Sequence, residues 1–191
     1  MNTPGHMVVN LALIGKKQKP GLTFPIFFGA LAPDIPIFLF YFFQKIVLKI
    51  PEMEIWRDVY FQSNWQNLFD AFHSIPIILA ALLISHAWKR EKTAAFFASM
   101  LLHTFFDFPL HYDDAHRHFF PLSDFRFLSP VSYWDPNRYG QLGAFVELTV
   151  VTVASIAVWR RDKTRLVRGV VALALILYAS GLVVALMLWG A

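Results

Sequence analysis

Histidine and aspartate recur at five places along this chain, each inside or beside an apolar stretch. They are His6, Asp34, the pair Asp70 and His73, the pair His103 and Asp107, and the loop residues His111 and His118. Imidazole nitrogens and carboxylate oxygens are the ligands that Zn²⁺ takes in proteins, and Mn²⁺ or Fe²⁺ accept the same set. The chain has no cysteine, so thiolate ligands, cysteine nucleophiles and disulfides are excluded. These residue types predict a divalent metal site, with zinc the expected ion and manganese or iron the alternatives.

Two of these places have helical spacing. Asp70 and His73 are three residues apart, and His103 and Asp107 are four apart, so each pair should project from one face of a helix. A carboxylate at bilayer depth costs at least about 2.5 kcal/mol, and no Lys or Arg lies within the apolar stretches that hold these acids. The acids must then be bound to metal, paired with histidine, hydrated or protonated. We predict that the metal ligands are His6, Asp34, His73, His103, Asp107 and His111. By contrast, His86 stands alone on an apolar stretch and is expected to be a hydrogen-bonded core residue.

The composition indicates a membrane protein. Hydrophobic residues make up 57% of the 191 residues and charged residues 16%, against about 25% charged in an ordinary soluble domain. This excludes a disordered chain or a soluble nucleic-acid binder, so no nucleic-acid partner is expected despite the net charge of +4. A helix needs about 20 apolar residues to cross the hydrocarbon core. Five windows come near or reach that length: residues 24–43, 68–88, 94–110, 142–159 and 169–189.

These windows predict an all-α, polytopic membrane protein. Residues 1–191 form one integral membrane domain with five transmembrane helices, a short N-terminal helix that extends half way across, and a long loop at 111–141. Pro25, Pro33 and Pro36 predict a kinked or broken first span. Eleven Lys and Arg residues lie in one set of loops and six in the other, which places the loop 111–141 on the outer side. With this orientation the predicted ligands lie at mid-depth or in the outer half of the membrane.

Four short motifs, in this order, resemble a known family. They are TPGH at residues 3–6, APD at 32–34, FHS at 72–74 and LLHTFFD at 101–107. The chain resembles the membrane-bound, metal-dependent hydrolases (YdjM-like, LexA-binding, inner-membrane-associated hydrolases) from its N-terminus to about residue 121. The resemblance implies a metal-dependent hydrolase in the bacterial inner (cytoplasmic) membrane. It maps the family's pattern onto His6, Asp34, His73, His103 and Asp107.

A remoter similarity concerns zinc-dependent phospholipase C, which has a comparable order of histidine and aspartate and hydrolyses phosphoesters. This chain departs from both patterns. Pro36 stands where the hydrolase family often has a second acid, and residues 67–70 (NLFD) stand where it often has His-Arg. Asp70, or a histidine from residues 111–118, would then fill the missing role. Gly143 stands where the phospholipases have a later histidine.

The expected activity is hydrolysis by a metal-activated water, with Asp70 and His118 as the catalytic residues that carry protons. Outward-facing cations would hold a phosphate, namely Arg117, Arg126 and Arg138. A site in the outer leaflet favours a phosphoester in a lipid or another amphiphilic substrate, so the expected partners are membrane lipids and that substrate. No oligomeric state is predicted.

Two other functions are compatible with the same residues. Intramembrane acids and histidines also relay protons or carry a metal ion in transporters. Alternatively, the chain is a non-catalytic membrane adaptor that binds a partner through its outer loop. Metal or proton flux would favour the transporter. Loss of function from changes in residues 133–139, but not at His103 or Asp107, would favour the adaptor.

Overall fold

The fold was described from a computed structural model, which covers residues 1–16, 18–133 and 135–189, apart from the side chains of residues 20, 182 and 184–189. Within these residues the chain is all helix and loop, without a strand, so the all-α prediction is confirmed. Lys17 and Trp134 lie outside the described residues. The helices are α1 Thr3–Ile14, α2 Thr23–Leu31, α3 Ile35–Phe42, α4 Glu52–Glu54, α5 Ser63–Phe72, α6 Ile75–Ala87, α7 Glu91–Asp107, α8 Gly140–Arg161 and α9 Arg165–Trp189.

Three helical segments among the described residues are long and apolar enough to cross a membrane. They are Thr23–Val47, Ser63–Ala87 and Gly140–Arg161. The other two predicted spans correspond to α7, which has 17 residues, and α9, which has 25. Large apolar side chains are exposed on the helices, for example Leu39, Phe105 and Phe145 at 63%, 67% and 67%. Such a surface is compatible with lipid contact.

Two of the three segments are interrupted near their middles. A 3-10 turn at Ala32–Asp34 separates α2 from α3, because Pro33 and Pro36 lack the backbone N–H that a continuous helix needs. The break between α5 and α6 lies at His73 and Ser74, where the Ser74 hydroxyl accepts a hydrogen bond from the N–H of Ile77 at 3.2 Å and so begins α6. The expectation of a broken first span is therefore confirmed, and the second span is broken as well.

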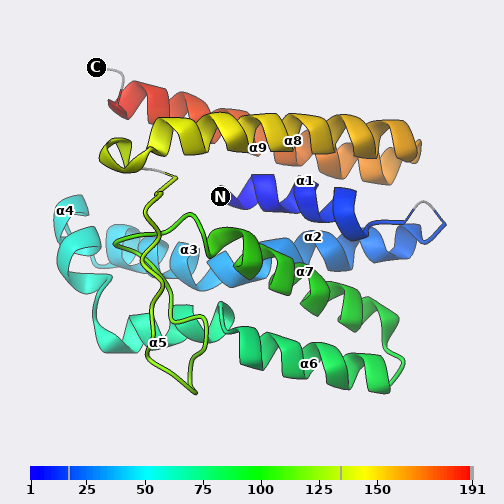
Figure 1. Cartoon of the computed structure of the whole chain (residues 1–191). Helices are drawn as coiled ribbons and strands as arrows, with labels where there is room; N and C mark the ends of the chain where they lie inside the picture. The colour runs from blue at the N-terminus through cyan, green and yellow to red at the C-terminus, as the bar shows by residue number, and fades with distance from the viewer. Residues whose placement is uncertain (17, 134, 190–191) are drawn as a thin grey trace.

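The short helix α1 lies at the centre of the bundle. It packs against α2 and α7 on one side and against α8 and α9 on the other (Figure 1). Its residues Val8 and Leu11 belong to the main hydrophobic core, together with Val151 and Val158 of α8 and Ala174 of α9. This central position carries the N-terminal residues of α1 into the interior.

The loop after α7 lies across one end of the bundle and contacts α5 and α6 (Figure 1). The carbonyl of His118 accepts a hydrogen bond from the N–H of Ile75 at 2.8 Å, and Ser74 donates to the carbonyl of Phe120. Nearer to α7, the N–H of Ser129 donates to the carbonyl of His111 at 2.9 Å. The first two hydrogen bonds hold the loop over the break between α5 and α6.

Candidate metal centre

Four predicted ligands converge in the interior. Each of Asp34, His73, His103 and Asp107 offers one ligand atom, and these atoms all lie within 4.8 Å of one another. Asp34 ends the 3-10 turn, His73 lies at the break between α5 and α6, and Asp107 is the last residue of α7. Both histidines are fully buried, and the Asp34 and Asp107 side chains are only 16% and 4% exposed. A buried group of two imidazoles and two carboxylates is suited to a divalent cation.

Backbone carbonyls orient the two imidazoles of this group. His73 Nδ1 lies 2.9 Å from the carbonyl oxygen of Phe69, and His103 Nδ1 lies 2.6 Å from that of Ala30. We assign the proton to Nδ1 in both rings, because a carbonyl can only accept. Both Nε2 atoms are buried and have no hydrogen-bond partner among the described residues. A metal-ligating histidine has this arrangement, with one nitrogen held by a backbone oxygen and the other left for the metal.

The carboxylates face these free nitrogens. His103 Nε2 lies 2.9 Å from Asp107 Oδ2 and 3.6 Å from Asp34 Oδ1, and His73 Nε2 lies 3.8 Å from the same Asp34 oxygen. The other oxygen of Asp34 accepts a hydrogen bond from the Thr3 hydroxyl. The residues present thus fit a bound metal, and they are four of the six ligands that the sequence predicted.

The remaining predicted ligands, His6 and His111, lie beside Asp107 rather than within the group of four. The His6 ring stacks on His103, with centroids 3.7 Å apart, and its Nε2 is 2.8 Å from Asp107 Oδ1. His111 Nε2 lies 3.7 Å from the same oxygen, and its Nδ1 lies 2.8 Å from Asp114. Burial opposes protonation of His111, but its contacts with Asp107 and Asp114 outweigh burial and raise its pKa to about 9. This position therefore favours positive charge.

Asp70 has different partners from those expected for a proton carrier at the metal. Its fully buried carboxylate accepts from the backbone N–H and Nε of Arg117 at 3.0 and 2.5 Å, and Arg126 lies 3.4 Å away. It also lies 3.4 Å from His116 Nδ1. These contacts attach the loop after α7 to α5. The catalytic role of Asp70 stays a prediction.

The three arginines expected to bind substrate all have partners within the protein. Arg117 also contacts Asp124, and Arg126 also donates to Gln66 and to a backbone carbonyl. The Arg138 guanidinium lies over the Tyr112 ring, 3.1 Å from its centroid. Their role toward substrate stays a prediction, and a substrate phosphate would have to compete with these partners.

The His118 ring is buried beside the centre. The residue is 2% exposed, and neither ring nitrogen has a hydrogen-bond partner among the described residues. Burial lowers its pKa to about 4, so the ring is neutral at pH 7. The sequence had not assigned a role to the neighbouring His116, whose ring stacks on His73 with centroids 3.9 Å apart. Only its place in a histidine-rich loop could have indicated this contact.

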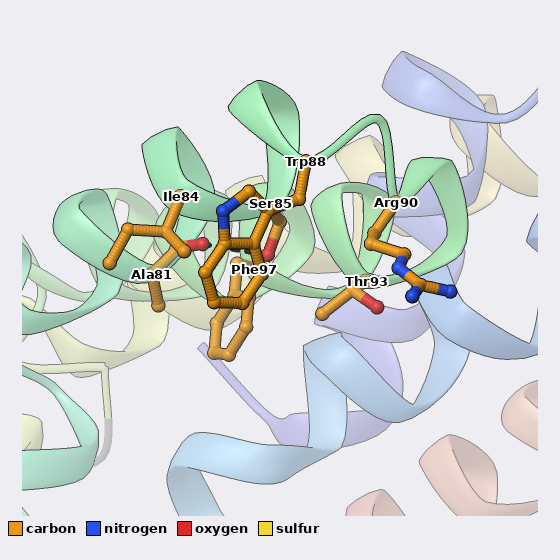
Figure 2. Close-up of a pocket in the computed structure, with 7 residues that line it drawn as sticks. All are labelled: Ala81, Ile84, Ser85, Trp88, Arg90, Thr93 and Phe97. Carbon is orange, nitrogen blue, oxygen red and sulfur yellow. Dashed lines mark hydrogen bonds between the residues drawn. The ribbon is translucent and has the colours of Figure 1, made fainter.

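Two other features lie away from the centre. Figure 2 shows a surface hollow at the turn between α6 and α7, lined by Ala81, Ile84, Ser85, Trp88, Arg90, Thr93 and Phe97. Its lining includes no histidine or carboxylate, so it lacks the chemistry of the metal centre. Nearby, His86 is exposed. The expectation that His86 is a core residue is therefore wrong, because its side of α6 has no neighbouring helix among the described residues.

Comparison with known proteins finds no matching family model and no similar curated protein or solved structure. The resemblance drawn from the four motifs thus stays a hypothesis from sequence. Function is therefore inferred from the geometry of the centre itself.

Proposed function

We propose that this chain is a metal-dependent hydrolase embedded in the bacterial inner membrane. The proposal rests on the convergence of Asp34, His73, His103 and Asp107, in which both Nε2 atoms are buried, face carboxylate oxygens and make no hydrogen bond among the described residues. A purely structural cluster would be expected to satisfy these nitrogens with hydrogen bonds. The proposal includes the five-span arrangement with the centre toward the outer side. In support, α7 and α9 are apolar helices that pack in the bundle.

The metal, most suitably zinc, would lower the pKa of a bound water to near neutrality. The residues of the chain then have separate tasks. Asp34, His73, His103 and Asp107 hold the cation, and the carbonyls of Ala30 and Phe69 keep the two imidazoles in position. His118 is buried and neutral at pH 7, with neither ring nitrogen hydrogen-bonded among the described residues, and is the proposed proton carrier.

The substrate class that we propose is a phosphoester in a lipid or another amphiphile. Asp34 and His73 lie near the middles of the 25-residue apolar segments Thr23–Val47 and Ser63–Ala87. A centre at that depth favours substrates that partition into the membrane. Of the three predicted phosphate-binding arginines, we assign Arg126 to the substrate phosphate. Its side chain contacts Asp70 and is still 31% exposed, so a phosphate can reach it.

The test combines metal content with hydrolysis. Wild-type protein purified in detergent is expected to contain zinc or another transition metal by elemental analysis, and to release phosphate or headgroup from phosphatidic acid or phosphatidylglycerol vesicles. His103→Ala should lose both properties, whereas His86→Ala, at an exposed site away from the centre, should keep both. Protein without any transition metal, whose hydrolysis is unaffected by chelators, would exclude the proposal.

A metal-ion transporter is the second candidate, and the broken helices favour it. Transporters commonly bind ions where two membrane helices are interrupted, as the helices here are at Asp34 and His73. Uptake of Zn²⁺ into proteoliposomes, without hydrolysis of either lipid, would support the transporter over the hydrolase.

A further inference from the structure

The two oxygens of Asp107 face different sets of histidines. Oδ2 lies 2.9 Å from His103 Nε2, within the group of four ligands. Oδ1 instead lies 2.8 Å from His6 Nε2 and 3.7 Å from His111 Nε2. The carboxylate is therefore placed between two clusters of imidazole nitrogens, and only one of them belongs to the centre described above.

His111 has the supporting contact of a metal ligand. Its Nδ1 lies 2.8 Å from Asp114 Oδ2, so this nitrogen carries a proton, and a bound cation would take the place of the proton on Nε2. The residue is 8% exposed, and its Nε2 has no hydrogen-bond partner among the described residues. An unpartnered nitrogen that is more than nine-tenths buried and lies near a carboxylate indicates a missing ligand.

We infer that Asp107 is shared by two cations, and that Asp107 Oδ1, His6 and His111 form a second site for a divalent transition metal. The second site depends on the proposed metal-dependent function, because it shares a ligand with the first. Three protein ligands leave a coordination position open for water, as at catalytic zinc sites. A carboxylate between two cations is suited to a two-metal hydrolase.

A group of the chain other than a second metal ion could supply the positive charge beside Asp107 Oδ1. The amino group of Met1 lies 2.7 Å from Asp107 Oδ1 and also provides positive charge there. It makes no hydrogen bond to His111 Nε2, which has no hydrogen-bond partner among the described residues, so it does not account for that nitrogen. The two explanations predict different numbers of bound metal ions, so metal stoichiometry distinguishes them.

The experiment is a Co²⁺ titration of the full-length, chelator-treated protein in detergent. Wild-type protein and the control His86→Ala are expected to bind two equivalents. His111→Ala should bind one equivalent, because Asp34, His73 and His103 remain, and His111→Gln should do the same with unchanged helix content by circular dichroism. Two equivalents bound by both His111 variants would overturn the second site.

A measurement on the unaltered protein tests whether Asp107 is shared. Two Mn²⁺ ions that share a carboxylate are exchange-coupled, so the electron paramagnetic resonance spectrum of the loaded wild type should show a coupled pair. Two uncoupled Mn²⁺ signals would overturn the shared ligand. One Co²⁺ equivalent in the wild type with hydrolysis intact would overturn the second site alone, whereas no bound Co²⁺ would overturn the proposed function as well.

Discussion

Replacing Gly29 tests the close approach of α2 and α7, which brings two parts of the centre together. A Cβ atom at Gly29 would collide with the backbone carbonyl of Phe96 and would lie 2.8 Å from Ser99 Cβ. Next to this contact, the carbonyl of Ala30 reaches His103 Nδ1 at 2.6 Å. Gly29→Ala should therefore separate the helices and move the carbonyl that orients His103.

The expected loss of stability follows from two opposing terms. Overpacking typically costs about 1–3 kcal/mol, and the upper end applies here because a backbone atom of Phe96 cannot rotate away. Alanine in place of glycine within a helix recovers about 1 kcal/mol, so the net loss is about 2 kcal/mol. Gly169→Ala, in α9, is the matched control, because a Cβ there meets nothing within 4 Å. That variant should gain about 0.5–1 kcal/mol.

The assay is denaturant unfolding in detergent micelles, followed by tryptophan fluorescence, with metal affinity measured on the same samples. Gly29→Ala should also bind metal about 10–100-fold more weakly, the usual effect of losing a contact that orients a ligand. If both glycine variants change the free energy of unfolding in the same direction, the close approach does not determine stability. Unchanged metal affinity in a destabilised Gly29→Ala would refute the link between this approach and the centre.

Three further predictions concern the loop and its charges. Arg117→Ala leaves the buried carboxylate of Asp70 with fewer partners and should destabilise the protein by about 3 kcal/mol in the same unfolding assay. The control Lys45→Ala removes an exposed ion pair and should cost less than about 1 kcal/mol. Asp114→Asn should weaken metal binding at the second site about 10–100-fold by isothermal titration and leave the first site unchanged. The pKa of His118 is about 4 in the folded protein, below the 6.5 of an exposed histidine, so the unfolded chain binds more protons between these values. Metal-free protein should therefore lose on the order of 1–2 kcal/mol between pH 7 and pH 5, and His118→Gln should reduce that loss.

The sequence predicted the ligands better than it predicted their neighbours. His103 and Asp107 share one uninterrupted helix, so their four-residue spacing places both at the centre. Asp70 and His73 have a similar spacing, but α5 ends at Phe72 and His73 leaves the helical conformation, with φ −100° and ψ 7°. The two side chains therefore diverge. His73 points to the metal group and Asp70 to Arg117. Helical spacing is informative only when the helix continues through both residues.

The contacts of the loop after α7 could not be predicted for a different reason. His111, His116 and Arg117 contact residues of α5 and α7 through irregular backbone, which has no periodicity to read from the sequence. The sequence showed that the loop holds possible ligands such as His111 and His118, but only the fold shows which of its histidines faces Asp107. Pro33 and Pro36 did indicate the break in the first span, because proline removes a backbone donor wherever it stands.

The helix breaks perform two tasks at the centre. They place Asp34 and His73 where the chain leaves one helix for the next, so that short side chains can reach a common point. They also supply the acceptors for the histidines: Ala30 lies in the last turn of α2 and Phe69 in the last turn of α5. Carbonyls in a last turn can lack intrahelical partners, although the Phe69 carbonyl also accepts the backbone N–H of His73 at 3.1 Å. The Nδ1–H groups of His73 and His103 donate to the Phe69 and Ala30 carbonyls, and the same hydrogen bonds direct both Nε2 atoms toward the carboxylates. Continuous helices through these positions would remove both the acceptors and the convergence, so the metal centre and the interrupted spans depend on each other.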